Sequence, residues 1–193
     1  MRWILDPAHT QIAFSIQHMS VTFATGRFTR FTSEFHLDER VPEHSFFEIA
    51  IDAASIATDN RDRDAHLRSP DFLNTEAWPT IRYRSGAITP LGFNHFNVAG
   101  MLTLHGVSHP VPLEVTLGGV AIDPEGRRRA GFSARGRVNR GEYGLTWNAP
   151  LESGGSVLGS TVRLEIEAEL VELPSASGAP DQPDASAHLI SNQ

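Results

Sequence analysis

The stretch FNVAGMLTL at residues 96–104 alternates between two faces along its whole length. Its apolar face carries Phe96, Val98, Gly100, Leu102 and Leu104. A second stretch, AGFSARGRV at residues 130–138, repeats the pattern with Ala130, Phe132, Ala134, Gly136 and Val138 on one face. Alternation with a period of two is typical of a strand that is buried on one side. These two stretches therefore predict a β-sheet protein.

Small residues interrupt the apolar face of both stretches. Glycine weakens a strand interior, and one reason to keep it there is the close approach of another backbone or a ligand. A closed sheet lined partly by Gly and Ala need not fill its own interior, so the pattern predicts a barrel with a cavity. The alternative is a filled barrel, in which each small residue faces a large one.

The same alternation extends through most of the chain. We expect further strands at residues 10–19, 28–37, 46–51, 81–83, 111–117 and 162–170. The step from Phe28 to Phe31 breaks the period and predicts a bulge. About eight strands at hairpin spacing favour an antiparallel barrel over a parallel α/β sheet.

Residues 58–79, TDNRDRDAHLRSPDFLNTEAWP, interrupt the strand pattern. Asp59 or Asn60 can cap a short helix, and Ser69-Pro70 predicts a second helical turn. We therefore expect a short helical insertion near residues 59–77. The barrel domain spans residues 1–173, and residues 174–193 form a tail whose Ser, Ala, Gly, Pro and Asp content predicts disorder.

Composition excludes several classes of function. The net charge of −7 does not fit a general nucleic-acid-binding surface. The chain has no cysteine and no lysine, which excludes thiol nucleophiles, disulfides, zinc–thiolate sites and lysine Schiff bases. The apolar run in the opening MRWILDPAHT is shorter than the core of a signal peptide. No stretch of the sequence has the length and apolar character of a membrane span. We therefore expect a cytoplasmic protein.

Four stretches, in order along the chain, together resemble the YceI family of lipocalin-like polyisoprenoid-binding proteins. They are DPAHTQIAFSIQHMSVTFATGRF at 6–28, RDRDAHLRSPDFLNTEAWPTIRYRS at 61–85, VAGMLTLHGVSHPV at 98–111 and RAGFSARGRVNRGEYGL at 129–145. The resemblance implies an eight-stranded antiparallel lipocalin-like barrel with a long apolar tunnel. It also implies a long-chain ligand such as a polyisoprenoid or an isoprenoid quinone, and a possible homodimer. Many members of the family are periplasmic.

Three hypotheses for the function follow. The first is a protein that sequesters or transports a long-chain amphiphilic lipid: a polyisoprenoid or isoprenoid quinone, or alternatively a fatty acid or fatty amide. The second is an enzyme acting on a lipid held in the barrel, which would need a titratable pair facing inward. The third is a structural or stress-related interaction protein whose barrel is filled by its own side chains. We expect no catalytic residues, no metal and no cofactor.

The inward face of the barrel supplies the candidate ligand-binding residues, although each of them could equally be ordinary core. They are Phe14, Ile16, His18, Phe28, Phe31, Phe35, Ile49, Val98, Gly100, Leu102, Phe132, Ala134, Leu164 and Ile166.

Polar residues near this face have two interpretations each. His18 shares the apolar face of its strand, as a hydrogen-bonded core residue or as a contact for a ligand head group. The stretch RDRDAHLRS suggests a self-paired network, with Arg61, Arg63 or Arg68 available to an anionic head group. His105 and His109 lack the spacing of a helical zinc pair and have no evident third ligand.

Overall fold

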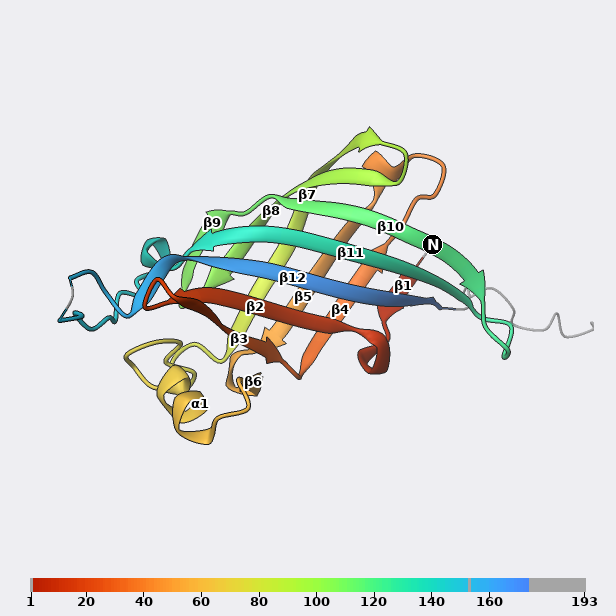
Figure 1. Cartoon of the computed structure of the whole chain (residues 1–193). Coiled ribbons are helices and arrows are strands. Elements are labelled where there is room, and N and C mark those ends of the chain that lie inside the picture. The colour runs from red at the N-terminus through yellow and green to blue at the C-terminus, as the bar shows by residue number, and fades with distance from the viewer. Residues whose placement is uncertain (1, 153, 174–193) are drawn as a thin grey trace, which may run out of the picture.

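The computed structural model describes residues 2–152 and 154–173 (Figure 1). The tail predicted at residues 174–193 lies outside this range. The strands are β1 (Arg2–Leu5), β2 (Gln11–His18), β3 (Thr22–Phe28), β4 (Phe31–His36), β5 (Phe46–Asp52), β6 (Ile56–Ala57), β7 (Thr80–Gly92), β8 (His95–Leu104), β9 (Val107–Pro110), β10 (Leu113–Ile122), β11 (Arg128–Asn139) and β12 (Leu158–Glu172). The helix α1 covers Arg61–Arg68, and 3-10 turns form η1 (Pro7–His9), η2 (Pro42–His44), η3 (Ala53–Ser55) and η4 (Arg140–Tyr143).

The strands close into an antiparallel barrel. Hydrogen-bonded neighbours follow the order β1–β4–β5–β7–β8–β10–β11–β12, and β12 returns to β1. β12 pairs with β2 along its first part, where Leu164 faces Phe14, and with β1 near its end, where Leu170 faces Leu5. β1 and β2 therefore occupy a single position beside β12. The predicted eight-stranded antiparallel barrel with one short helix is confirmed.

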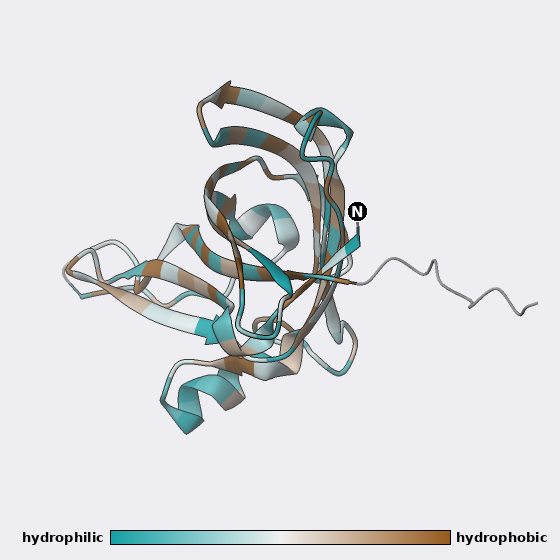
Figure 2. Cartoon of the chain, turned by 90° about the vertical axis from the view of Figure 1, so that its right-hand side faces the viewer, coloured by the Kyte–Doolittle hydropathy of each residue, from teal (hydrophilic) through white to brown (hydrophobic). Residues whose placement is uncertain are grey.

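The alternation in the sequence appears in the structure as bands of opposite hydropathy along the strands (Figure 2). Helix α1 is largely hydrophilic in the same view and lies outside the barrel wall. Among the described residues, none of the helices has the length and apolar character needed to cross a membrane.

The break in period between Phe28 and Phe31 is an interruption of the strand rather than a simple bulge. β3 ends at Phe28 and β4 begins at Phe31. The amides of Thr29 and Arg30 donate to Oγ of the buried Ser55 at 3.2 and 3.1 Å. These bonds replace the strand-to-strand hydrogen bonds that are lost where the backbone turns. The side chains of Phe28 and Phe31 both still face the interior of the barrel.

The helical insertion contains one helix followed by turns. Oδ1 of Asn60 accepts from the amide of Arg63 at 3.0 Å, so Asn60 is the N-cap of α1. The turn expected after Ser69 forms, with the amide of Phe72 bonded to the carbonyl of Ser69 at 3.0 Å, but it does not extend into a second helix, and the amide of Leu73 bonds back to the carbonyl of Leu67. Asn74 then takes a positive φ of 45°, which turns the chain towards β7.

Candidate ligand-binding cavities

The barrel encloses two apolar cavities. The first, of about 380 Å³, is lined by Arg63 and Leu67 of α1 among others, and we call it the helix-side cavity. The second, of about 310 Å³, is lined by Trp3 and Leu5 of β1 among others, and we call it the β1-side cavity. They share one ring of aliphatic side chains, which is Ile12, Ile49, Leu113 and Ile166. The two cavities are therefore adjacent sections of one interior.

Strand β12 follows this interior from one cavity to the other. Leu158, Val162 and Leu164 line the helix-side cavity, and Ala168 and Leu170 line the β1-side cavity. Ile166, between these groups, lines both. From residue 158 to residue 170 the strand covers about 40 Å at the usual rise of a β-strand. The inner face of a single strand thus spans both cavities.

Most of the predicted ligand-binding residues line one of these cavities. The helix-side cavity contains Phe14, Ile16, His18, Phe28, Ile49, Leu102, Leu164 and Ile166. The β1-side cavity contains Phe35, Ile49, Val98, Phe132, Ala134 and Ile166. Phe31 and Gly100 line neither.

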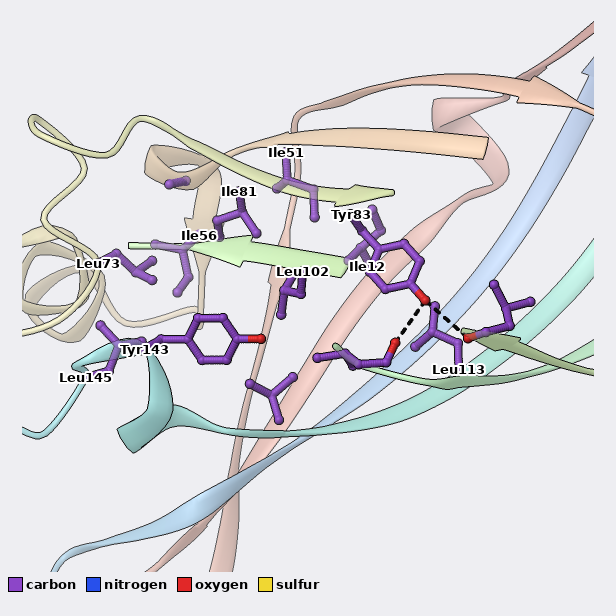
Figure 3. Close-up of a cluster of buried hydrophobic side chains, with 14 residues drawn as sticks. Ile12, Ile51, Ile56, Leu73, Ile81, Tyr83, Leu102, Leu113, Tyr143 and Leu145 are labelled. Carbon is purple, nitrogen blue, oxygen red and sulfur yellow. Dashed lines mark hydrogen bonds between the residues drawn. The ribbon is translucent and has the colours of Figure 1, made fainter. Parts of the chain in front are cut away.

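The space beside Gly100 is taken by a large side chain. A Cβ atom at Gly100 would lie 2.2 Å from the hydroxyl oxygen of Tyr83. That hydroxyl donates to the carbonyls of Val111 and Val98, which fixes the ring against the wall (Figure 3). Gly136 is covered by Leu113 in the same way, with 2.6 Å to Cδ2. At these two positions the small residue faces a large one.

Phe31 and the alanines behave differently from these glycines. Phe31 packs against both buried clusters of the barrel, one of which is centred on Trp3, Phe35 and Leu170. Ala130 and Ala134 line the β1-side cavity. Ala130 and Ala134 of β11 therefore border open space inside the barrel, whereas Gly100 and Gly136 are covered by large side chains.

The polar groups of the helix-side cavity are cationic or neutral. Its lining residues with polar side-chain atoms are His18, Thr25, Thr58, Arg63, His66, Tyr83, Arg140 and Trp147, and no described Asp or Glu lines it. The β1-side cavity has the opposite character, because Asp38 and Glu39 line it and no described Arg or His does. Asp38 accepts from the amides of Val41 and Arg40, and these bonds lower its pKa. Glu39 pairs with Arg128 at 2.8 Å.

Arg140 is a cavity residue that the sequence analysis missed. Only 7% of it is exposed. Its Nε donates to the carbonyl of Gly159 at 2.8 Å, and Nη1 donates to those of Leu145 and Trp147 at 2.6 and 2.9 Å. Burial lowers the pKa of Arg140. The inward alternation of β11 runs through Val138, and its continuation by one step would have found Arg140.

The charged stretch of α1 bonds mainly to the barrel rather than to itself. Arg63 donates through Nε to Oγ1 of Thr58 at 2.7 Å and through Nη2 to its carbonyl at 2.8 Å. Asp64 accepts from the same threonine, and Arg68 donates to the carbonyls of Ala54 and Ile56. These bonds hold the insertion on the end of the barrel. Arg63 lines the cavity, whereas Arg61 and Arg68 do not.

An aromatic cluster lies where the insertion meets the loop after η4. His66 contacts Phe72 and Trp147 edge-on, with ring centroids 5.0 and 4.8 Å apart. All three residues line the helix-side cavity. Nε2 of His66 lies 2.8 Å from a carboxylate oxygen of Asp71. Ser69 lies beside this pair, but its Oγ donates to the carbonyl of His66 at 2.7 Å, and no described Ser side chain lines the cavity itself.

Three of the other described histidines serve the fold or join ion pairs. His105 and His109 bond the carbonyls of Tyr143 and Glu142 at 3.1 and 3.0 Å, which attaches η4 to the barrel. His9 gathers with Asp6 and Glu169, in a spacing that could hold a cation. Arg129 already bonds both of these carboxylates, so its guanidinium supplies the positive charge there.

Fold and cavities together define the class: an antiparallel β-barrel with an elongated apolar interior suited to a small hydrophobic ligand. The YceI-like domain model matches residues 3–170, and the chain belongs to this family. Protein YceI of Salmonella newport (strain SL254) is 36% identical over 138 residues, which are 72% of each chain.

Two solved structures have the same architecture. Burkholderia cenocepacia BcnA superposes with a TM-score of 0.75 at 20% identity, covering 86% of this chain and 98% of that one. A polyisoprenoid binding domain from Saccharophagus degradans, implicated in plant cell wall breakdown, superposes with a TM-score of 0.66 at 15% identity. That alignment covers 88% of this chain and 97% of the domain. At these identities the likeness concerns the fold.

Proposed function

We propose that this protein binds a long-chain amphiphilic lipid inside the barrel, in order to sequester or transport it. A polyisoprenoid or an isoprenoid quinone is the favoured ligand, and a fatty acid or fatty amide is the alternative. The observation that carries the proposal is the pair of apolar cavities that meet at a single aliphatic ring. The description of the Saccharophagus degradans domain as polyisoprenoid-binding supports the same class of ligand.

The energetics require a long chain. Each CH₂ group removed from water contributes about 0.8 kcal/mol, so ten carbons contribute roughly 8 kcal/mol. Immobilising the ligand costs about 4–15 kcal/mol, so a ten-carbon tail binds weakly. A tail that continues from one cavity into the next exceeds this cost. Discrimination among tails should be weak, because an apolar wall distinguishes one methylene by only about 1–3 kcal/mol.

Binding without catalysis is the second part of the proposal. An enzyme would need reacting groups aimed into the cavity, with a nucleophile or base in reach of the lipid. The helix-side cavity offers His18 and the His66–Asp71 pair, but no described Ser side chain and no described acidic side chain lines it. This lining suits the recognition of a head group better than it suits bond cleavage.

Native mass spectrometry of the freshly purified protein, followed by solvent extraction, tests the proposal. We expect a co-purifying hydrophobic molecule. Titration with prenols of ten, fifteen and twenty carbons should then show affinity that rises with chain length. A protein that carries no such molecule and also fails to bind prenols, quinones and fatty acids would refute the proposal. Hydrolysis or modification of the bound lipid would instead support the enzyme hypothesis.

A further inference from the structure

The turn between β2 and β3 holds an apolar side chain in solvent on a strained backbone. The amide of Val21 bonds to the carbonyl of His18 at 3.1 Å, so Met19 and Ser20 are the two central residues of a tight turn. Their φ angles are 54° and 56°. Such turns favour Asn and Gly, because most other residues are strained at positive φ. The chain nevertheless has a methionine there, and 43% of it is exposed.

Two further exposed apolar side chains lie beside this turn. Val21 is 85% exposed and Phe23 is 42% exposed. The guanidinium carbon of Arg163, on β12, lies 4.3 Å from the centroid of the Phe23 ring. Single exposed apolar residues are ordinary on a protein surface, whereas several gathered at one place mark a site of interaction. The tip of the β2–β3 hairpin therefore presents a small apolar surface next to an arginine.

Among the described residues, two arginines beside this tip have no carboxylate partner. Arg163 lies directly opposite Arg137 of β11 in the ladder, and both side chains are exposed. Like charges directly opposite one another destabilise a sheet, so this pair weakens the ladder unless an anion from outside binds beside it. Arg135, the next outward residue of β11, instead lies opposite Glu165. We call the set Met19, Val21, Phe23, Arg137 and Arg163 the β2–β3 patch.

The exposed apolar tips at the other end of the barrel lie beside charges that are paired. The tips of the β2–β3 and β10–β11 hairpins are at opposite ends (Figure 1). Phe93 and Ile122, on the β7–β8 and β10–β11 hairpins, are 89% and 72% exposed. The arginines of the β10–β11 hairpin form ion pairs, Arg127 with Asp123 and Glu125, and Arg128 with Glu39 and Glu172. The β2–β3 patch therefore differs from this hairpin in combining apolar side chains with uncompensated positive charge.

We propose that the β2–β3 patch docks on the surface of an anionic lipid bilayer. Met19 and Val21 enter the boundary between the head groups and the acyl chains, and Arg137 and Arg163 contact lipid phosphates. Apolar and basic side chains together bind peripheral proteins to anionic membranes. A symmetric contact between two copies of the chain is disfavoured, because it would bring the same arginines together. The inference goes beyond the proposed function, since it does not depend on what the cavities hold.

Co-sedimentation of the full-length protein with vesicles tests the proposal. Vesicles of phosphatidylcholine alone are compared with vesicles of equal parts of phosphatidylcholine and phosphatidylglycerol. We expect about 5- to 25-fold stronger binding to the anionic vesicles, because each arginine near such a surface contributes about fivefold. The preference should weaken as salt is added, since the arginines are exposed.

Matched variants then assign the binding to the β2–β3 patch. Val21→Ser should bind the anionic vesicles about 10-fold more weakly, because less apolar surface leaves water. Arg137→Gln should bind about fivefold more weakly without lowering the thermal unfolding temperature, because it relieves the like-charge pair. Phe93→Ser is the apolar control at the opposite end. Arg84→Gln is the charge control, because Arg84 is exposed on β7, on the wall opposite β12. Both controls should bind like the wild type.

Equal binding to the two kinds of vesicle would contradict the proposal, and so would wild-type binding by the folded Val21→Ser and Arg137→Gln variants. Loss of binding in Phe93→Ser alone would move the membrane contact to the opposite end and overturn it as well. A wild-type dimer in analytical ultracentrifugation that dissociates in Val21→Ser, with no vesicle binding, would show that the patch binds a second copy instead. Displacement of a fluorescent apolar dye by farnesol reports on the cavities separately, so the proposed function can fail while docking stands, and the reverse.

Discussion

Replacing Ile166 with phenylalanine should divide the interior of the barrel. Ile166 lies opposite Ile12 in the β12–β2 ladder, and both side chains line both cavities. The larger ring would project into the passage between the helix-side and β1-side cavities. Ligands that fit within one cavity should still bind, whereas longer ligands should lose the contacts of the part that no longer passes.

The size of the effect follows from the carbon atoms excluded. One isoprene unit has five carbons, so its exclusion costs about 4 kcal/mol at 0.8 kcal/mol per carbon. That figure corresponds to about 1,000-fold in affinity and is an upper limit, since side chains around the ring can adjust. In the wild type, affinity should rise from geraniol to geranylgeraniol. In Ile166→Phe, it should level off once the first cavity is full.

Dye displacement with prenols of increasing length measures the effect. Ile166→Val is the matched control: it keeps the passage open, costs about 0.5–1.5 kcal/mol of stability and should retain the dependence on chain length. Thermal unfolding checks that the phenylalanine variant is folded, because overpacking costs about 1–3 kcal/mol. A folded Ile166→Phe protein with the wild-type ratio between long and short prenols would show that the two cavities do not bind one tail in series.

Three further predictions concern single positions. Gly100→Ala should destabilise the barrel by about 1–3 kcal/mol in thermal unfolding, because the new methyl group meets the Tyr83 side chain. Gly131→Ala is the control, because open space surrounds Gly131 and the added methyl group meets nothing. Equal stabilities of the two variants would contradict the packing described. The pKa of Asp6 is lowered to about 2, mainly by its hydrogen bond from Arg129. The ionised Asp6 side chain therefore stabilises the folded protein above its ordinary pKa of 3.8, and this contribution to the free energy of unfolding is lost as the pH falls towards 2. Urea unfolding between about pH 4 and pH 2 should therefore lose stability less steeply in Arg129→Gln than in the wild type, and parallel curves would argue against the ion pair. His18→Phe should reduce discrimination between head groups on a common tail, and unchanged affinity and selectivity in the same displacement assay would make His18 purely structural.

The barrel could be predicted because alternation is a local property of each strand. In β12, Leu164 and Ile166 face inward with Leu170 because the strand is continuous, and the sequence shows this directly. The helix cap at Asn60 is also local, since its side chain bonds an amide three residues away. The closure of the sheet into a barrel could be predicted from the number and spacing of such segments, and from the resemblance of four stretches to the YceI family. None of these inferences required knowledge of which side chains meet across the interior.

The open volume could not be predicted in the same way. Gly100 and Ala134 look alike in the sequence, as small residues on an apolar face. Tyr83 covers Gly100, while Ala134 borders a cavity. The difference depends on which side chain of a neighbouring strand points at each position, and register between strands sets this. The interruption between Phe28 and Phe31 has a similar origin, because Ser55, more than twenty residues away, stabilises it.

The inward position of Arg140 follows from the alternation of β11, although an arginine is not expected on a buried face. The inward face of β11 passes through Ala134, Gly136 and Val138, and the same parity places residue 140 inside. An arginine at that step looks like the end of the buried face, and η4 does begin there. The chain nevertheless keeps the side chain inside by supplying carbonyls from residues 145, 147 and 159. A charge that continues the inward parity of a strand is thus accommodated here by neutral carbonyl acceptors, which offset part of its desolvation cost.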